Sequence, residues 1–265
     1  MSGAADTADP DSSVDSPRPA TKAQRTRALV ADTALRLFRE QGYAATTMRE
    51  IAREAGVSTG NAYYHFDGKD ALVQELYRRI QDEHAAAARR ELVTGDSLGD
   101  NLRRVLHAGI TVMTPYHAFG DTLLSSALRP ESATSPFSED SDTARRAAVG
   151  ILQETVARSA RTPGGRVGER LPELLWLAHL GITLHWVLDR SAGQARTRTL
   201  IDGVAPLIAR VVQLARLPIG KGLAEDAVAL VDRVRPTVEG SRHDPAHDPE
   251  VEPSEAPPAD TEDRT

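Results

Sequence analysis

Apolar residues recur at helical spacing along most of the chain, from about residue 21 to residue 234. Runs of β-branched residues in alternation and Asn-Gly turns are nearly absent, so strands are not expected. Glycine and proline divide the helical pattern into segments. The pattern therefore predicts an all-α fold, with helices near residues 22–41, 59–65, 69–91, 97–114, 116–128, 139–161, 169–189, 194–216 and 221–234, and a short helix between Thr47 and Gly56.

Two short helices joined by a tight turn are expected near the start of the chain. Thr47 and Glu50 have the spacing of a capping box, in which both side chains satisfy free amides at a helix start. Gly56 permits the left-handed turn that follows, and Ser58 can cap the next helix. This arrangement is typical of a helix-turn-helix, whose second helix enters the major groove of DNA.

The second of these helices begins with residues that suit insertion into DNA. Thr59, Gly60 and Asn61 are small or polar, so the helix can approach base edges in a groove about 12 Å wide. Tyr63 and His65 follow, with polar tips that can reach phosphate oxygens. Taken singly, Tyr63 and Tyr64 fit a core, and Arg49 and Arg53 fit a solvated face. Their joint pattern favours DNA binding.

The charge of the chain is unevenly distributed around its net value of −6. Residues 1–20 carry four acidic residues against one arginine, and residues 236–265 carry nine against two. Residues 21–65 instead carry seven basic residues against four acidic ones, which suits a phosphate backbone. The acidic tails are expected to be disordered, either as solvated ends or as competitors of DNA for the basic face.

Several function classes are disfavoured by what the sequence lacks. The chain has no cysteine, which excludes disulfides and cysteine-ligated zinc. Its N-terminus has no apolar signal region, and no run reaches the roughly 18 apolar residues of a membrane span. No glycine-rich phosphate loop and no convincing nucleophile–base pair are present. We therefore expect a cytoplasmic protein that is not an enzyme, needs no cofactor and does not bind membranes.

Residues 45–66, with the sequence ATTMREIAREAGVSTGNAYYHF, resemble the DNA-binding signature of the TetR family, as do the following Lys69 and Leu72. The resemblance implies a three-helix DNA-binding domain followed by a helical domain that dimerises and binds a small molecule. It implies phosphate contacts from Thr47, Tyr63, His65 and Lys69, base contacts from Arg49, Thr59, Gly60 and Asn61, and a boundary position for Tyr64; Ser58 completes the candidate DNA-binding set.

The expected domains are a tail over residues 1–20, a helix-turn-helix domain over 21–67, an effector and dimerisation domain over 68–235, and a tail over 236–265. The segment 174–188 is apolar nearly all round and must be covered on both sides. We expect it and the helix after it to pair with a second copy, although central core is the alternative. The candidate interface residues are Leu174, Gly181, His185, Val204, Ile208 and Val211.

An effector pocket is expected where the scarce aromatic residues gather, around Pro115 and on the helix that contains Trp176. The histidines in this set also raise the possibility of a metal site, but no close pair has a supporting carboxylate, so no metal is predicted. The candidate pocket residues are His107, Met113, Tyr116, His117, Phe119, Trp176, His179 and Leu180.

These features predict a homodimeric repressor that leaves a palindromic operator in double-stranded DNA when a small organic effector binds. The effector would favour a form of the dimer in which the two copies of the DNA-reading helix, residues 59–65, are wrongly spaced for the operator. The alternative is a DNA-binding activator or partner-controlled regulator without a small-molecule ligand.

Overall fold

The computed structural model describes residues 21–120 and 132–217, together with residues 124, 222, 225, 226, 229 and 233. These residues are predominantly helical and contain no strand, only one isolated bridge between Ser97 and Ala160. The all-α prediction is confirmed for this part of the chain. Both predicted tails, and most of the helices expected at 116–128 and 221–234, lie outside the described residues.

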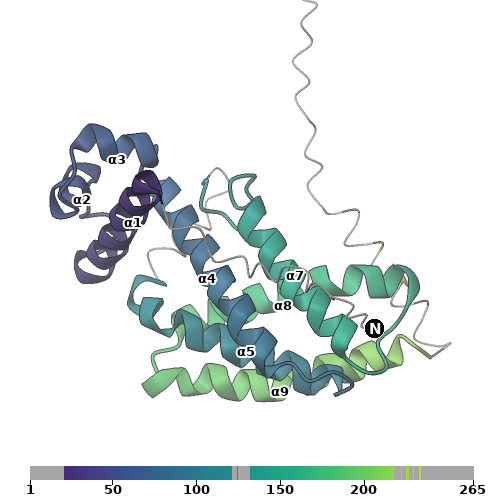
Figure 1. Cartoon of the computed structure of the whole chain (residues 1–265). Helices are drawn as coiled ribbons and strands as arrows, with labels where there is room; N and C mark the ends of the chain where they lie inside the picture. Colours follow the sequence, from purple (N-terminus) through teal and green to yellow (C-terminus); the bar gives the residue numbers. More distant parts are fainter. Residues whose placement is uncertain are drawn as a thin grey trace, which may run out of the picture.

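Three helices pack together at the N-terminal end and form what we call the head: α1 (Lys22–Gln41), α2 (Met48–Glu54) and α3 (Thr59–His65) (Figure 1). They share a core that includes Val30, Phe38, Ile51, Ala62 and Phe66, all nearly inaccessible to solvent. The first and third helices have the predicted bounds. Each end is set by a local signal, such as Gly42 with a φ of 87° at the end of α1.

The long helix α4 (Lys69–Glu91) runs from the head into the remaining helices, which we call the body (Figure 1). The body core is built from fully buried aliphatic side chains on several helices, such as Leu106 on α5 and Ile201 on α9. The elements of the body are α5 (Leu98–Met113), η1 (Thr114–Tyr116), α7 (Asp142–Arg158), α8 (Gly165–Leu188), η2 (Ala192–Gln194) and α9 (Ala195–Leu214).

The predicted capping box of α2 is only half formed. The Thr47 hydroxyl accepts a hydrogen bond from the Glu50 amide at 3.2 Å, as expected. The Glu50 carboxylate does not return to Thr47 but accepts from Gln41 Nε2 at 2.9 Å, which ties α2 to the end of α1. A complete capping box forms instead at the start of α1, between Thr21 and Gln24.

Two body helices begin at positions other than predicted. Helix α7 starts at Asp142 rather than near residue 139, because a serine-rich turn precedes it, in which Ser138 Oγ donates to the Ala133 and Ser135 carbonyls. Helix α8 starts at Gly165 rather than near residue 169. A Cβ at Gly168 would lie 2.3 Å from the Pro163 carbonyl oxygen, so this early turn of α8 requires glycine.

Two histidines are buried against each other in the body, where α4, α5 and α8 meet. The rings of His84 and His179 are stacked with centroids 5.6 Å apart, and His84 Nε2 lies 2.9 Å from the Val105 carbonyl oxygen. Gly109 makes room for His84, since a Cβ there would lie 3.0 Å from Nε2. Burial and the neighbouring His84 ring lower the pKa of His179 from 6.5 to about 3.

This pair makes stability depend on pH. The unfolded chain binds protons near the ordinary histidine pKa of 6.5, whereas folded His179 remains neutral until about pH 3. Stability is therefore full above pH 6.5 and falls below it, by about 2 kcal/mol at pH 5 for one such histidine. Urea unfolding of His179→Phe should show a shallower fall between pH 6.5 and 5, whereas Thr111→Ala, at an exposed position of α5, leaves both histidines in place and should keep the native profile. An unchanged profile for His179→Phe would contradict this prediction.

Candidate nucleic-acid interface

The start of α3 is held by its own side-chain cap after a turn that only glycine adopts easily. Gly56 has a φ of 66°, in the left-handed region. Ser58 Oγ then accepts a hydrogen bond from the Asn61 amide at 3.1 Å. The tight turn and the cap fix the direction in which α3 leaves α2, so its first residues project from the head as one rigid unit.

Almost all of α3 faces solvent. Ala62 is its only buried residue, and Phe66 beyond its end enters the head core. Tyr63 and Tyr64 have exposed fractions of 49% and 83%. Their flat rings with hydroxyl tips suit contacts to a DNA backbone.

Glycine at position 60 is not required by the protein itself. A Cβ built there would meet no heavy atom within 4 Å, and Gly60 does not have a positive φ. Alanine would normally stabilise a helix by about 0.5–1 kcal/mol over glycine. The absence of a side chain on this exposed face is consistent with close approach of another molecule to the helix backbone.

Residues from α2 and α3 line a hollow of about 620 Å³ on the surface of the head. Within the described part of the chain, Arg49 has no ion-pair partner and its guanidinium is exposed at this hollow, whereas Arg53 pairs with Glu54 at 3.1 Å. The structure thus brings four of the predicted DNA-binding residues to one concavity. The lining consists of Thr47, Arg49, Glu50, Arg53, Val57, Ser58 and Thr59.

Two predicted phosphate contacts also have a structural role at the junction of the head and α4. Lys69 Nζ donates to the Tyr43 carbonyl at 2.7 Å and lies 4.3 Å from the centre of the Tyr43 ring. Burial lowers the pKa of Lys69, and nearby Asp70 opposes this effect. The His65 carbonyl accepts a hydrogen bond from Arg27, while its ring contacts Tyr64 edge-on. The sequence pattern gave no sign of these junction contacts.

Several of the eight candidate pocket residues have polar or ring contacts with residues outside this set. His107 Nε2 lies 2.8 Å from Asp202 Oδ1, a contact between α5 and α9. Phe119 stacks on a side chain of the head, and His117 Nε2 lies 2.9 Å from the Trp186 carbonyl oxygen. The others lie in different parts of the body: Met113 and His179 are buried, Trp176 packs edge-on against Phe137, Tyr116 lies beside Arg39, and Leu180 packs half-buried on the core.

The candidate interface residues divide between core and surface. Leu174, Val204 and Ile208 are half-buried, whereas Gly181, His185 and Val211 are exposed. The structure adds larger exposed apolar side chains that the sequence pattern did not single out, because a helix that is apolar nearly all round does not indicate which face remains uncovered. They are Leu177, Leu184 and Leu188 on α8, and Leu207 and Leu214 on α9.

A capped helix-turn-helix with an exposed polar reading helix, joined to a helical body, defines a DNA-binding transcription regulator. The family of bacterial regulatory proteins of the tetR type matches residues 30–76, and the tetracyclin repressor-like C-terminal domain matches residues 101–229. The chain belongs to the TetR family, whose members are transcription regulators and not enzymes.

Individual relatives resemble this chain mainly over part of their length. The HTH-type transcriptional repressor KstR2 of Rhodococcus jostii is 39% identical over 92 residues, 35% of this chain and 42% of that protein. The HTH-type transcriptional regulator UidR of Escherichia coli is 31% identical over 117 residues, 44% of this chain and 56% of that protein. The chain therefore spans about half the length of these relatives.

Solved structures support the architecture. A tetR-family transcriptional regulator from Streptomyces coelicolor aligns with a TM-score of 0.53 at 22% identity, covering 79% of this chain and 95% of that one. A regulator of the same family from Syntrophomonas wolfei also gives 0.53, at 14% identity, with 71% and 96% covered. These similarities confirm the predicted fold of a helix-turn-helix head on a helical body.

Proposed function

We propose that this protein is a homodimeric repressor, acting in the cytoplasm, that is released from a palindromic operator by a small organic effector. The observation that carries the proposal is the exposed face of α3, where Asn61 and Tyr63 project from a helix fixed by the Ser58 cap. In this proposal residues 21–67 bind DNA and residues 68–235 dimerise and bind the effector. Each copy inserts α3 into one major groove, about one helical turn from its mate.

The dimer is supported by uncovered apolar surface on α8 and α9. Leu184 and Leu188 follow Gly181 along α8, and Leu207 and Val211 lie one turn apart on α9 with exposed fractions of 56% and 66%. Exposed apolar side chains on two helices that contact each other suit an interaction site. A second copy with the same patch would cover it around a two-fold axis.

Helix α8 is also, among the described residues, the one helix long and apolar enough to cross a membrane by length and composition. Its inner face carries Trp176, His179 and Trp186 into the body core. Since 44% of the apolar window is already buried within the protein, a bundle with a second copy accounts for its composition better than lipid does.

The effector proposal draws on buried polar atoms of the body. Among the described residues, Gln81 Oε1 on α4, Thr183 Oγ1 on α8 and Trp186 Nε1 on α8 are buried without a hydrogen-bond partner. Buried polar groups are almost always satisfied by protein, water or ligand. A ligand with apolar bulk and a few hydrogen-bonding groups suits such surroundings, and the proposed pocket includes the predicted residues Trp176 and His179.

Release would work through α4, which contacts both the head and the body. An effector lowers operator affinity only if it binds more tightly to a form in which the two heads are wrongly spaced. Helix α4 is the covalent connection between the two parts (Figure 1), so a shift of its body end changes the position of α3. A thermal-shift screen of small organic molecules tests this step, since a true effector raises the melting temperature.

The DNA-binding step predicts different losses for two neighbouring residues of α3. Asn61→Ala should relax the preference at one base pair and cost about 1–3 kcal/mol on the selected sequence. Tyr63→Phe should weaken binding to all sequences by about 1–2 kcal/mol, because it loses a hydroxyl bond to phosphate. Gel retardation on duplexes selected by the wild-type protein from a random pool measures both. Thr111→Ala, at an exposed position of α5, serves as control; native binding by an Asn61→Ala, Tyr63→Phe double variant would contradict the placement of α3.

A further inference from the structure

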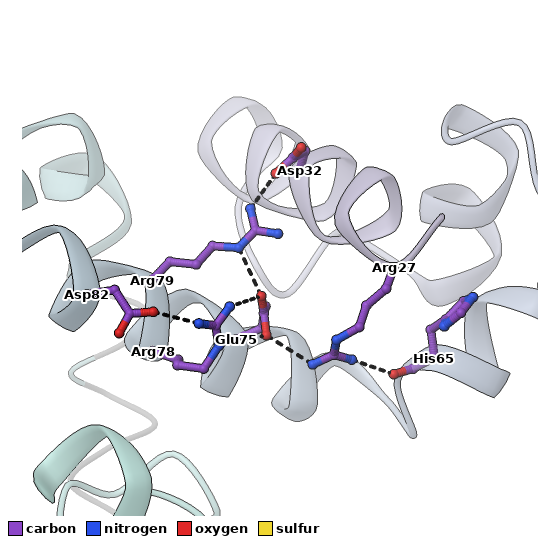
Figure 2. Close-up of polar contacts among 7 residues, drawn as sticks. All are labelled: Arg27, Asp32, His65, Glu75, Arg78, Arg79 and Asp82. Carbon is purple, nitrogen blue, oxygen red and sulfur yellow. Dashed lines mark hydrogen bonds and ion pairs between the residues drawn. The ribbon is translucent and has the colours of Figure 1, made fainter. Parts of the chain in front are cut away.

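Glu75 on α4 is a buried carboxylate surrounded by three arginines (Figure 2). Its side chain is 6% exposed. Arg27 Nη2 lies 3.0 Å from Oε2, Arg78 Nη2 lies 2.7 Å from Oε1, and Arg79 Nε lies 3.0 Å from Oε1. Both carboxylate oxygens are thus occupied by charged donors, which is the condition under which a buried carboxylate remains ionised.

The electrostatics of this site keep Glu75 charged. Burial would raise the pKa of Glu75, but hydrogen bonds from Arg78 and Arg79 and the charge of Arg27 outweigh it, so the pKa lies below its ordinary value. The flanking carboxylates of Asp32 and Asp82 balance the additional arginine charge. The cluster is therefore a network of three arginines and three carboxylates.

One of the three arginines connects three helices. Arg27 belongs to α1, and besides its ion pair with Glu75 on α4 its Nη1 donates to the His65 carbonyl at 2.9 Å. His65 is the last residue of α3. The Arg27 guanidinium also lies 4.2 Å from the centre of the Phe66 ring. A single planar group thus contacts the end of the reading helix and the first turns of α4.

A second set of ion pairs also joins Glu75 to α1, through an arginine of α4; we call it the second arm. Arg79 on α4 pairs with Glu75 and also with Asp32 on α1 (Figure 2). Among the described residues, the ion-pair partners of Arg78 are Glu75 and Asp82, which both lie on α4 itself. Two of the three arginines therefore cross between head and α4, and the third does not.

We propose that Glu75 is a positioning residue that fixes the angle between the head and α4, and thereby the spacing of the two reading helices in the dimer. The inference rests on the proposed dimeric DNA binding. A buried carboxylate that accepts directed hydrogen bonds from several arginines can specify a geometry even where it adds little net stability. Because the Arg27 fork contacts both Glu75 and the end of α3, a rotation of α3 against α4 breaks at least one of its bonds.

The test uses DNA duplexes that carry two copies of the half-site selected by the wild-type protein, with the separation between them varied one base pair at a time. The readout is the ratio of affinity at the best separation to affinity one base pair away. For Arg27→Gln this ratio should fall about fivefold or more, within the usual range of coupling between sites. Affinity for a duplex with a single half-site depends on base recognition by α3 but not on the spacing of the two copies. This measurement therefore separates a loss of positioning from a loss of base recognition.

Arg78→Gln is the matched control, since Arg78 and Arg27 have exposed fractions of 48% and 44% and both pair with Glu75. It breaks no contact between α1 and α4 and should keep the native ratio. Arg27→Lys retains the charge that DNA would sense but not the fork that spans Glu75 and the His65 carbonyl, so it should behave like Arg27→Gln. Asp32→Asn, which cuts the second arm, provides an independent variant if Arg27→Gln does not fold.

The outcomes separate the two proposals. If the wild-type protein binds no duplex, or binds without any preference for separation, the proposed function fails and the positioning role falls with it. If the wild-type protein discriminates separations, and Arg27→Gln and Asp32→Asn do so equally well, the positioning role alone is wrong. Restoration of the native ratio by Arg27→Lys would assign the effect to charge rather than to geometry and would also overturn it.

Discussion

Replacing Leu207 and Val211 together with glutamate is expected to convert the proposed dimer into a folded monomer with much weaker operator binding. Both side chains are more than half exposed in the single chain, so the variant loses little core packing on folding. In the dimer each glutamate would be buried without a partner, which costs about 3–5 kcal/mol per charge. The dimer dissociation constant should therefore rise at least about a hundredfold.

Sedimentation at micromolar concentration and gel retardation measure the two consequences. Operator affinity should fall at least about tenfold, because a monomer contacts one half-site only. Val93→Glu is the matched control: Val93 follows α4, is similarly exposed, and lies outside the α8 and α9 patch. A double variant that still sediments as a dimer would show that the two copies meet elsewhere.

The sequence was sufficient where a short stretch of chain determines its own structure. The bounds of α1, α3 and α4 agree with those predicted, because Gly42, Ser58 and the Asp67-Gly68 break act within one turn of the helix end they set. The candidate DNA-contacting surface could be predicted for the same reason. Its residues are nearly contiguous, and the turn at Gly56 places them side by side without help from the rest of the fold.

The body could be predicted as helical but not in its arrangement. Whether an apolar residue of α8 or α9 faces the core or solvent depends on how α9 packs on α5, for example where Gly99 lies against Pro206 and Ala209. Periodicity carries no information on such contacts between distant segments. For the same reason the stacking of Phe119 on Phe38 of α1 could not be predicted from the sequence.

The junction of head and body was missed for a related reason. Arg27, Asp32 and Glu75 each appear in the sequence as ordinary charged residues on amphipathic helices. Their role depends on α1 crossing α4, which places Arg27 beside a residue 48 positions further along the chain. The only hint in the sequence is the run of two arginines after Glu75, which is also common on solvated helix faces.

The junction has an apolar part as well, and the second large effect is expected there. Phe38 on α1 is 2% exposed and stacks on Phe119, with ring centroids 5.5 Å apart and planes 6° from parallel. The Phe38 ring also packs against Tyr43, with ring centroids 5.3 Å apart. Removing a buried phenylalanine side chain costs about 3–5 kcal/mol, through lost transfer energy and the cavity left behind. Phe38→Ala should therefore be among the most destabilising single changes in the head.

The position of Phe38 also determines which part of the molecule unfolds first. Both tryptophans of the chain, Trp176 and Trp186, lie on α8 in the body, so their fluorescence follows the body alone. Circular dichroism follows all helices. In urea, Phe38→Ala should lose helical signal before fluorescence changes, because the head loses its core and its stacking contact with the body together. Leu29→Ala, a half-exposed position on the same helix, should stay within about 0.5 kcal/mol of the wild type. If the fluorescence and circular-dichroism transitions of Phe38→Ala coincide, and its free energy of unfolding falls by less than about 1 kcal/mol, Phe38 does not hold the head to the body.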